Sequence, residues 1–529
     1  MELRPYQVEA VNAVFKSFWG FRRVLMVLPT GCGKTVVFAE IARRVMERHG
    51  NKVLILAHRE ELLDQAREKI WKVAGITADV ERAGLHASAS SSVVVASVQT
   101  LGRDARLNEY APNHFALIII DEAHHAPTAG YRRILDYFNA KVLGVTATPD
   151  RADKKKLSTV FDTVAYEYSI LDAVRDRYLV PPMAQMMPVQ IDLSHAHVRN
   201  GDYDAAEAAA ALEPVLGKVA DEMAKACASR RTVVFLPLVR ISQAFAQMLR
   251  DRGLSAAEIN GESADRTQVL ADFSAGKYQV LCNSMLLTEG WDCPAVDCIV
   301  VLRPTQSRAL YVQMVGRGMR LSPETGKKDL LILDFLWLTG RHLLCRPSAL
   351  FAKTEEEAKA ADKRLEVAGQ AVDIMEVGQQ AERDVLKERA AALVRAAAAQ
   401  CHKKARLVNP LIFASEIAEL GLADYEPVFE WQKAPPSEKQ LDAIERFGVD
   451  SSLVESRGFA AALMDRLIAR SKSGLATVKQ VHKLTGYGFV NVSSWTMKQA
   501  SSVLDLIAGN GWMVPYGIDP ATYNPEVVA

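Results

Sequence analysis

The sequence predicts an α/β protein with two tandem doubly wound parallel-sheet lobes, followed by a helical C-terminal region. Within residues 1–350, short runs of Val, Ile and Leu alternate with helical patterns in two successive series. Such runs are typical of parallel strands that are buried on both faces. Repeated β-α units of this kind form doubly wound sheets. After residue 350 the composition shifts to Ala, Glu, Lys and Arg, which favour helix.

Apolar runs predict strands in both lobes, and helical patterns such as 36–48 and 60–72 lie between them. Pro181, Pro182 and Pro188 interrupt the pattern, so we expect the segment Leu179–Pro188 to link the two lobes. The expected strands are Arg23–Leu28, Lys52–Ala57, Ser92–Val98, Ala116–Asp121 and Lys141–Thr148 in the first lobe, and Thr232–Leu236, Gln279–Asn283, Asp297–Leu302 and Leu330–Phe335 in the second.

The domain organisation follows from these patterns. The expected parts are a first lobe at 1–180, a second lobe at 181–350, a charged helical connector at 351–407 and a helical C-terminal domain at 408–529. The connector is expected to be either a long solvated helix or a helical hairpin.

The C-terminal domain contains a tandem repeat with an offset of 40 residues, 437–470 and 477–510. Ser437 and Thr477 are expected to cap the first helix of each copy. Gly448 and Gly488 are expected to end those helices. The alternative is chance similarity between two helical segments. A duplicated helical unit is the favoured interpretation.

Bulk properties exclude several classes of protein. The chain has 529 residues and a formal net charge of +1, so any surface that attracts nucleic acid must be local. The seven cysteines include no C-x-x-C pair, which argues against a zinc module and fits a reducing compartment. No apolar stretch approaches the roughly 18 residues of a membrane helix, and the N-terminus does not resemble a secretory signal. We therefore expect a cytoplasmic protein in a bacterial or phage-infected cell.

A phosphate-binding loop is predicted by the segment PTGCGKT, which follows a strand and opens a helix. Gly31 and Gly33 allow backbone N–H groups to surround phosphate oxygens, and Lys34 is expected to bridge the β- and γ-phosphates. Thr35 is expected to ligate Mg²⁺. Leu28 stands where the first Gly of the usual pattern would be. The expected nucleotide-binding residues of this loop are Thr30, Gly31, Cys32, Gly33, Lys34 and Thr35.

An acidic box, DEAH, ends the apolar run Leu117–Ile120. Parallel strands deliver the side chains at their C-terminal ends to the crevice where nucleotides bind. Asp121 is expected to hold Mg²⁺ through water, and Glu122 to orient the water that attacks the γ-phosphate. His124 is expected to couple nucleotide state to the other lobe.

Two further segments, TATP at 146–149 and QMVGRGMR at 313–320, follow the phosphate loop and the acidic box along the chain. With these motifs in this order, the chain resembles the superfamily 2 helicases, which have two RecA-like lobes. The resemblance implies that Thr146 and Thr148 link ATP state to the grip on nucleic acid. It implies that Arg317 and Arg320 reach the γ-phosphate from the second lobe as arginine fingers, and that Gln313 of the same motif is a catalytic residue. Arg317 and Arg320 are three residues apart, so we expect them to share a helix face.

Two further segments extend the resemblance. LRPYQ near the N-terminus resembles the adenine-sensing element of these helicases, with Arg4 and Gln7 in the matching places. A Gln amide can both donate to and accept from an adenine edge, which suits that role. TEGWDCP places Gly290 and Asp292 beside the nucleotide. Within the superfamily, these motifs look closest to RadD-like and XPB-type DNA motors. RadD-like proteins usually carry cysteine-rich segments after the motor; this chain has none there, so the resemblance ends near Phe351.

The resemblance implies an ATP hydrolase that uses ATP and Mg²⁺ and moves along DNA, in repair, recombination or replication. Arg59, Thr100 and Thr288 are the expected contacts to the DNA backbone, which would give no sequence readout. The C-terminal repeats could bind DNA or a partner protein, or simply pack on the motor. Two alternatives stay open: an RNA-remodelling ATPase, and the motor subunit of a restriction or defence complex.

Overall fold

The computed structural model of this chain describes residues 3–49, 52–57, 60–88, 90–147, 155–199, 201–227, 229–263, 265–284, 287, 291–339, 344–352, 354–385, 408, 413, 422 and 425–525. The chain divides into two compact units, Met1–Gln379 and Gln380–Ala529. No helix within those described ranges is both long enough and apolar enough to cross a lipid bilayer.

The first lobe is built on a seven-stranded sheet of order β3-β4-β2-β5-β6-β1-β7, in which every neighbouring pair is parallel. The central strands are buried along nearly their whole length, as the apolar runs predict. The strands are β1 (Arg23–Val27), β2 (Val53–Ala57), β3 (Asp79–Glu81), β4 (Val93–Ser97), β5 (Leu117–Asp121), β6 (Lys141–Thr146) and β7 (Thr163–Glu167).

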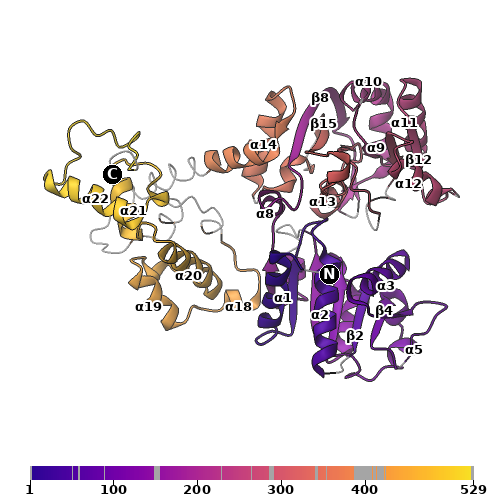
Figure 1. Cartoon of the computed structure of the whole chain (residues 1–529), viewed down its shortest axis with the longest axis horizontal. Helices are drawn as coiled ribbons and strands as arrows, with labels where there is room; N and C mark the ends of the chain where they lie inside the picture. Colours follow the sequence, from indigo (N-terminus) through magenta and orange to yellow (C-terminus); the bar gives the residue numbers. More distant parts are fainter. Residues whose placement is uncertain are drawn as a thin grey trace. The chain divides into compact units, whose positions relative to one another are not determined.

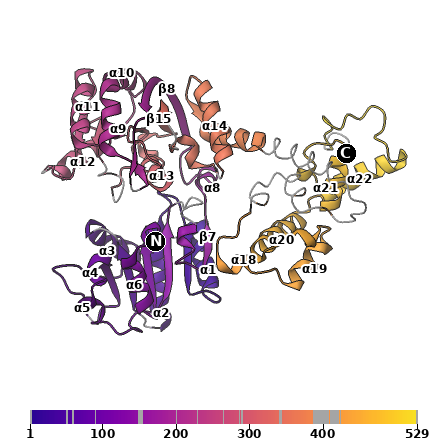
Figure 2. The same cartoon turned by 180° about the vertical axis from the view of Figure 1, so that it is seen from behind.

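Helices cover both faces of this sheet, as a doubly wound fold requires. Figure 1 shows α2 and α3 over one face, and Figure 2, from behind, shows α6 over the other. α6 buries its apolar side chains, Tyr131 among them, against the sheet. The helices are α1 (Pro5–Ser17), α2 (Lys34–His49), α3 (Glu60–Ala74), α4 (Val98–Leu101), α5 (Asp104–Leu107), α6 (Ala129–Tyr137) and α8 (Ile170–Arg175).

The second lobe has its own seven-stranded sheet, of order β12-β13-β11-β14-β15-β8-β16. All neighbours are parallel except β16, which is antiparallel to β8. The strands are β8 (Pro182–Leu193), β11 (Thr232–Phe235), β12 (Ala256–Ile259), β13 (Val280–Asn283), β14 (Cys298–Val301), β15 (Leu330–Thr339) and β16 (Val372–Asp373). The chief helices are α9 (Ala205–Leu212), α10 (Leu216–Ala226), α11 (Val239–Asp251), α12 (Arg266–Ser274) and α13 (Arg308–Gly316).

The expected linker at Leu179–Pro188 is wrong for most of its length, because β8 begins at Pro182 and pairs with β15. Pro182 is the first residue of the strand, where a missing N–H is tolerated. Pro188 lies where the β8–β15 register shifts, between the pairs Met187–Phe335 and Gln190–Leu336. A bulge of this kind leaves a residue outside the ladder. Pro182 therefore marks the start of a strand, and Pro188 marks its irregularity.

The expected connector also differs from a purely helical segment within residues 354–385. α14 (Glu355–Val367) begins at the N-cap Thr354 and is followed by Gly369, whose φ is +64°. β16 then adds to the edge of the second sheet, and 374–385 is helical again. Edge pairing with β8 decided this segment, and Val372–Asp373 gives almost no strand signal in the sequence.

The C-terminal unit contains two copies of one arrangement: a capped helix, a left-handed glycine, a short 3-10 turn and a second helix. In the first copy these are α19 (Glu438–Arg446), Gly448 and α20 (Arg457–Lys472). In the second copy they are α21 (Val478–Gly486), Gly488 and α22 (Met497–Gly509). Ser437 and Thr477 are the N-caps, as expected, and the structure shows that each forms a capping box with a Gln side chain. Two apolar cores form, one centred on each copy, and Val478 of the second copy packs into the first core.

Candidate functional site

The phosphate-binding loop joins β1 to α2, the context that the sequence predicts. Gly31 has a φ of +91° and Gly33 a φ of +74°, a region that favours glycine. A Cβ on Gly33 would lie 2.7 Å from the side-chain nitrogen of Gln7. A Cβ on Gly31 would lie 3.1 Å from the side chains of Leu179 and Arg320. The loop is therefore curled tightly between α1 and residues that follow the first lobe.

The N-terminal helix α1 fixes this loop through the Cys32 carbonyl. The Tyr6 hydroxyl donates to that oxygen at 2.8 Å, and Gln7 Nε2 donates to it at 3.2 Å. The Gln7 Oε1 atom accepts the Arg4 backbone N–H at 3.0 Å. Gln7 is 4% exposed, so both ends of its amide are engaged inside the protein. In this conformation Gln7 binds the phosphate loop through the Cys32 carbonyl. Its expected contact with adenine stays a prediction.

The acidic box lies opposite the loop, at the C-terminal end of β5. Glu122 has φ 51° and ψ 56°, which is a left-handed conformation and uncommon for a residue with a side chain. Its carboxylate forms an ion pair with Lys34, with 3.1 Å between Nζ and Oε1. Asp121 Oδ1 accepts the Glu122 backbone N–H at 3.0 Å. A strained backbone held in place by its surroundings is common at functional sites.

The second lobe reaches the same carboxylate. Gln313 Nε2, from α13, donates to the second carboxylate oxygen of Glu122 at 3.2 Å. His124 Nδ1 lies 3.5 Å from that oxygen. Burial acts to raise the pKa of Glu122, but Lys34 and His124 outweigh it and hold the pKa well below its usual range. Glu122 is therefore an anion with two oxygens, one bound by each lobe.

Arg320 lies outside the expected helix, because α13 ends at Gly316 with Arg317 as its C-cap. The expectation that Arg317 and Arg320 share a helix face is thus wrong. At Gly318, a Cβ would collide with Leu330, so the chain turns away there in close contact with β15. Arg320 instead forms a β-bridge with Leu179 and an ion pair with Asp292. Its side chain lies beside Gly31 of the phosphate loop.

Arg317 is tied to its own lobe. Its Nη1 donates to the Trp291 carbonyl at 2.7 Å, and the residue is 8% exposed. This contact fixes the segment that carries Asp292. Beside the helix end, a Cβ on Gly316 would lie 2.8 Å from the Thr30 Cβ. The end of α13 and the phosphate loop are therefore packed against each other.

The remaining predicted residues divide into described and undescribed positions. Thr146 is buried at the end of β6, where its carbonyl accepts the Leu28 N–H at 3.0 Å and so ties β6 to the phosphate loop. Thr100 lies in α4 and is 5% exposed. Thr35 lies in the first turn of α2. Arg59, Thr148, Thr288 and Gly290 lie outside the described residues.

Thr35 and Asp121 are the oxygen donors that the site offers to a magnesium ion. Mg²⁺ keeps several waters and takes one or two protein oxygens with substrate phosphates, so this small donor set fits it. Among the residues that the structure describes, no three His, Cys, Asp or Glu side chains group as metal ligands. Gly31 and Gly33 carry no Cβ, so the backbone of the loop beside Lys34 can approach a ligand closely.

An aromatic cluster beside the loop was missed from the sequence. Tyr6 stacks on Tyr168 with 4.5 Å between ring centroids and an angle of 6°. Tyr178 lies against Tyr6 at 4.8 Å, and the Arg4 guanidinium lies over the Tyr178 ring at 5.0 Å. The only sequence signal was the Tyr of LRPYQ, since Tyr168 and Tyr178 follow β7, a strand that was not expected.

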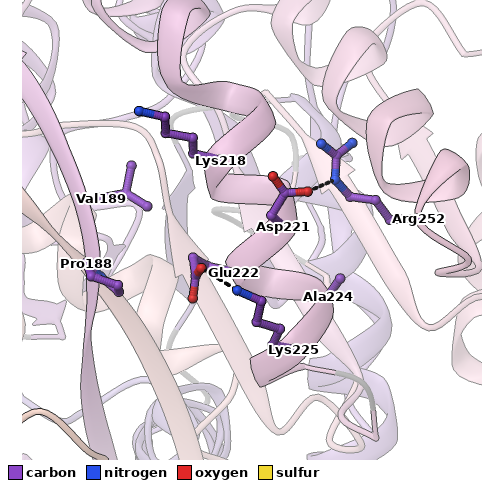
Figure 3. Close-up of a pocket in the computed structure, with 8 residues that line it drawn as sticks. All are labelled: Pro188, Val189, Lys218, Asp221, Glu222, Ala224, Lys225 and Arg252. Atoms are coloured by element: carbon purple, nitrogen blue, oxygen red, sulfur yellow. Dashed lines mark hydrogen bonds and ion pairs between the residues drawn. The ribbon is translucent and has the colours of Figure 1, made fainter.

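A surface hollow on the second lobe lies apart from these motifs (Figure 3). Two ion pairs, Asp221 with Arg252 and Glu222 with Lys225, satisfy most of its charges. Lys218 points away from both pairs in Figure 3. The hollow holds none of the predicted site residues. Its lining residues are Pro188, Val189, Lys218, Asp221, Glu222, Ala224, Lys225 and Arg252.

Two family models match the chain. The family described as type III restriction enzyme, res subunit, matches residues 1–151, and the helicase conserved C-terminal domain matches residues 216–322. The Saccharomyces cerevisiae protein named ATP-dependent helicase IRC3 is 33% identical over 377 residues, which are 67% of this chain and 54% of that protein.

A second relative is the DNA 3'-5' translocase XPB2 of Sulfurisphaera tokodaii, which is 24% identical over 63% of this chain and 81% of the relative. A solved fragment of an HsdR subunit of a type I restriction enzyme from Vibrio vulnificus is 26% identical, with a TM-score of 0.50. It covers 63% of this chain and 64% of that fragment. The chain spans only about half the length of two yeast relatives that it matches.

Proposed function

Because this chain carries the motor core of the superfamily 2 ATP-dependent helicases, we propose that it is an ATP-driven DNA translocase or helicase. The observation that carries the proposal is the pairing of Glu122 with both lobes: Lys34 binds one carboxylate oxygen and Gln313 binds the other. A carboxylate held in this way can sense whether the lobes are together. Hydrolysis that depends on lobe closure is the basis of a motor.

The residues divide the chemistry between the lobes. When nucleotide binds, Lys34 would exchange Glu122 for the β- and γ-phosphates, since a triphosphate carries more negative charge than one carboxylate. Glu122, freed from Lys34 but still held by Gln313, would orient a water for in-line attack on the γ-phosphate. A Mg²⁺ ion held by Thr35 and Asp121 would neutralise charge on the phosphate oxygens.

Arg320 would supply positive charge from the second lobe. It lies beside Gly31 and is paired with Asp292, so exchange of that partner for a phosphate oxygen would couple hydrolysis to the position of the lobe. Arg317 lies at the end of α13 and positions the Trp291 segment. His124, Thr146 and Thr148 are proposed to pass the state of the nucleotide to the nucleic-acid surface.

DNA is the proposed track. A relative is named a DNA translocase. Arg59 and Thr288 are the proposed backbone contacts, whereas Thr100, which is 5% exposed, has almost no surface to offer a phosphate. The likeness to a restriction-enzyme family and to an HsdR fragment supports a second candidate, the motor subunit of a restriction or defence complex. The two differ in partners: a motor subunit would co-purify with a nuclease or specificity chain, and a stand-alone translocase would not.

The test is ATP hydrolysis by the full chain with no nucleic acid and with single-stranded DNA, duplex DNA, forked DNA or RNA. We expect stimulation of at least about tenfold by a DNA substrate and little by RNA. Stimulation by RNA alone would overturn the choice of DNA. Absence of ATP hydrolysis under every condition, with a folded chain, would overturn the proposed function itself.

A further inference from the structure

The two copies of the C-terminal repeat share a fold but differ in charge. Residues 437–470 contain five Lys and Arg and six Asp and Glu. Residues 477–510 contain three Lys and a single acidic residue, Asp505. Lys479, Lys483 and Lys498 are all exposed. The second copy therefore presents a local positive surface, although the whole chain is nearly neutral.

The first copy covers a face that the second copy leaves open. Gly458, at the start of α20, has no room for a Cβ because the Tyr425 hydroxyl occupies that space, with the Gln432 Cβ at 2.6 Å. These side chains come from the segment that includes α18 (Glu430–Lys433). The equivalent position in α22 is Lys498, 40 residues later, and it is exposed beside Met497, which is 44% exposed. In the first copy this face thus receives an aromatic ring from the chain itself.

The loop that follows α22 in the second copy carries two exposed aromatic rings. Trp512 is 52% exposed and Tyr516 fully exposed, although the neighbouring Val514 and Ile518 anchor the loop in the apolar core. Trp512 has a φ of +63°, and its N–H donates to the Ile507 carbonyl at 2.9 Å. A left-handed backbone is costly for a residue with a side chain, and such residues cluster at functional sites, so Trp512 is a candidate binding residue.

One lysine of the second copy lies against one of these aromatic rings. Lys483 Nζ lies 3.4 Å from the centroid of the Trp512 ring. Lys479 is one turn earlier on the same face of α21. Gln480 Nε2 donates to the Met497 carbonyl and to the Ser501 hydroxyl, which brings the starts of α21 and α22 side by side. We define the tail surface as Lys479, Lys483, Met497, Lys498, Trp512 and Tyr516. α21 and α22 are labelled in Figure 1.

We propose that the tail surface binds single-stranded DNA, with bases stacked on Trp512 and Tyr516 and phosphates beside Lys479, Lys483 and Lys498. Proteins that bind single strands without sequence preference combine aromatic platforms with a cationic track. The carboxylate of Asp519 is engaged locally, where it accepts hydrogen bonds from the Ala521 N–H and the Thr522 hydroxyl. The site belongs to the C-terminal unit and rests on the proposed function only in the choice of DNA as the ligand.

The experiment compares two fluorescent oligonucleotides of equal length, oligo-dT and an abasic strand, in anisotropy titrations with the full chain. The abasic strand keeps the phosphates and removes the bases, so the ratio of the two affinities reports stacking. The motor contacts proposed above are to the backbone, so they contribute to both probes alike. We expect the wild-type chain to prefer oligo-dT.

Trp512→Ala, alone and with Tyr516→Ala, is expected to weaken binding of oligo-dT about fivefold or more and to leave binding of the abasic strand nearly unchanged. Trp19→Ala is the matched control, because Trp19 is 93% exposed in the first lobe and outside the tail surface. Lys483→Gln should lower the slope of log affinity against log salt by about 0.7, whereas Lys439→Gln in the first copy should not. Circular dichroism checks that each variant is folded.

Equal affinity of folded Trp512→Ala and wild type for oligo-dT, together with an unchanged salt slope for Lys483→Gln, would overturn the tail site. That outcome with DNA-stimulated ATPase intact in the wild-type chain would leave the proposed function standing. If DNA does not stimulate ATP hydrolysis by the wild-type chain, but the chain still prefers oligo-dT to the abasic strand, the proposed function would be overturned and the tail site would stand. Equal affinity of the wild-type chain for the two strands would also overturn the tail site.

Discussion

Gln313 and Glu122 are 191 positions apart in the chain, and a hydrogen bond of 3.2 Å joins their side chains. Gln313 belongs to α13 of the second lobe, and Glu122 follows β5 of the first. The bond binds the oxygen of Glu122 that Lys34 does not use. A change in the distance between the lobes must therefore alter the environment of this carboxylate.

Gln313→Ala should lower kcat of ATP hydrolysis about tenfold to a hundredfold with a smaller change in KM. The amide binds the Glu122 carboxylate, which would orient the attacking water, so its loss affects the chemical step most. Steady-state kinetics with saturating DNA gives both constants. Gln268→Ala is the control, since Gln268 lies in α12, where its side chain donates to Asp272. A rise in KM with unchanged kcat would show that Gln313 serves binding instead.

Lys34→Ala and Glu122→Gln should each abolish hydrolysis, but they should differ in stability. Lys34→Ala leaves the buried Glu122 charge without its main partner, so it should lower the melting temperature, at a cost of about 1–3 kcal/mol in the free energy of unfolding. Glu122→Gln in the Lys34→Ala background removes that charge and should recover part of the lost stability without restoring activity. Calorimetry measures both changes. A double variant no more stable than Lys34→Ala alone would contradict the buried ion pair.

Arg320→Ala and Arg317→Ala should have different effects. Arg320→Ala should lower turnover by up to about 10³–10⁵-fold with little change in ATP affinity and little change in melting temperature, because its partner Asp292 is exposed. Arg317→Ala leaves the Trp291 carbonyl without its donor and should lower the melting temperature, at a cost of about 1–3 kcal/mol. Turnover, nucleotide binding and thermal unfolding separate the two. Normal turnover of Arg320→Ala would exclude it as the catalytic arginine.

Asp362→Asn should stabilise the chain at neutral pH and not in acid. Burial raises the pKa of Asp362 from 3.8 to about 6, although Arg346 acts to lower it. A carboxyl with a raised pKa contributes stability below pH 3.8, and that contribution is lost as the pH rises through 6. The melting temperature of the variant relative to wild type should therefore increase between about pH 4 and pH 7. A difference that does not vary with pH would contradict the buried carboxyl.

Local residues were enough to predict much of the site. Gly31, Gly33 and Lys34 are read from a short segment because the curl of the loop depends on backbone conformations that few residues other than glycine adopt. The capping boxes of Ser437 and Thr477 are local for the same reason, since cap and partner are three residues apart. Buried parallel strands such as β5 can also be predicted from the sequence, because both of their faces must be apolar.

Other features depend on which segments meet. Pro182 and Pro188 suggested a linker, and only the pairing of β8 with β15 shows that they stand at a strand start and at a register shift. Arg320 left the expected helix because Gly318 packs against Leu330, a contact between segments that are not neighbours in sequence. The tail surface likewise depends on Lys483 meeting Trp512, which a spacing rule within one helix does not reveal.

The sequence by itself determined the chemistry that this chain can offer, a phosphate loop, an acidic box and a set of second-lobe cations, because each is encoded by neighbouring residues and by the periodicity of strands and helices. The tertiary structure alone decided which of these groups meet. Glu122 is shared by Lys34 and Gln313, and Arg320 stands beside Gly31, because close packing between distant segments fixes such contacts and no local pattern records them.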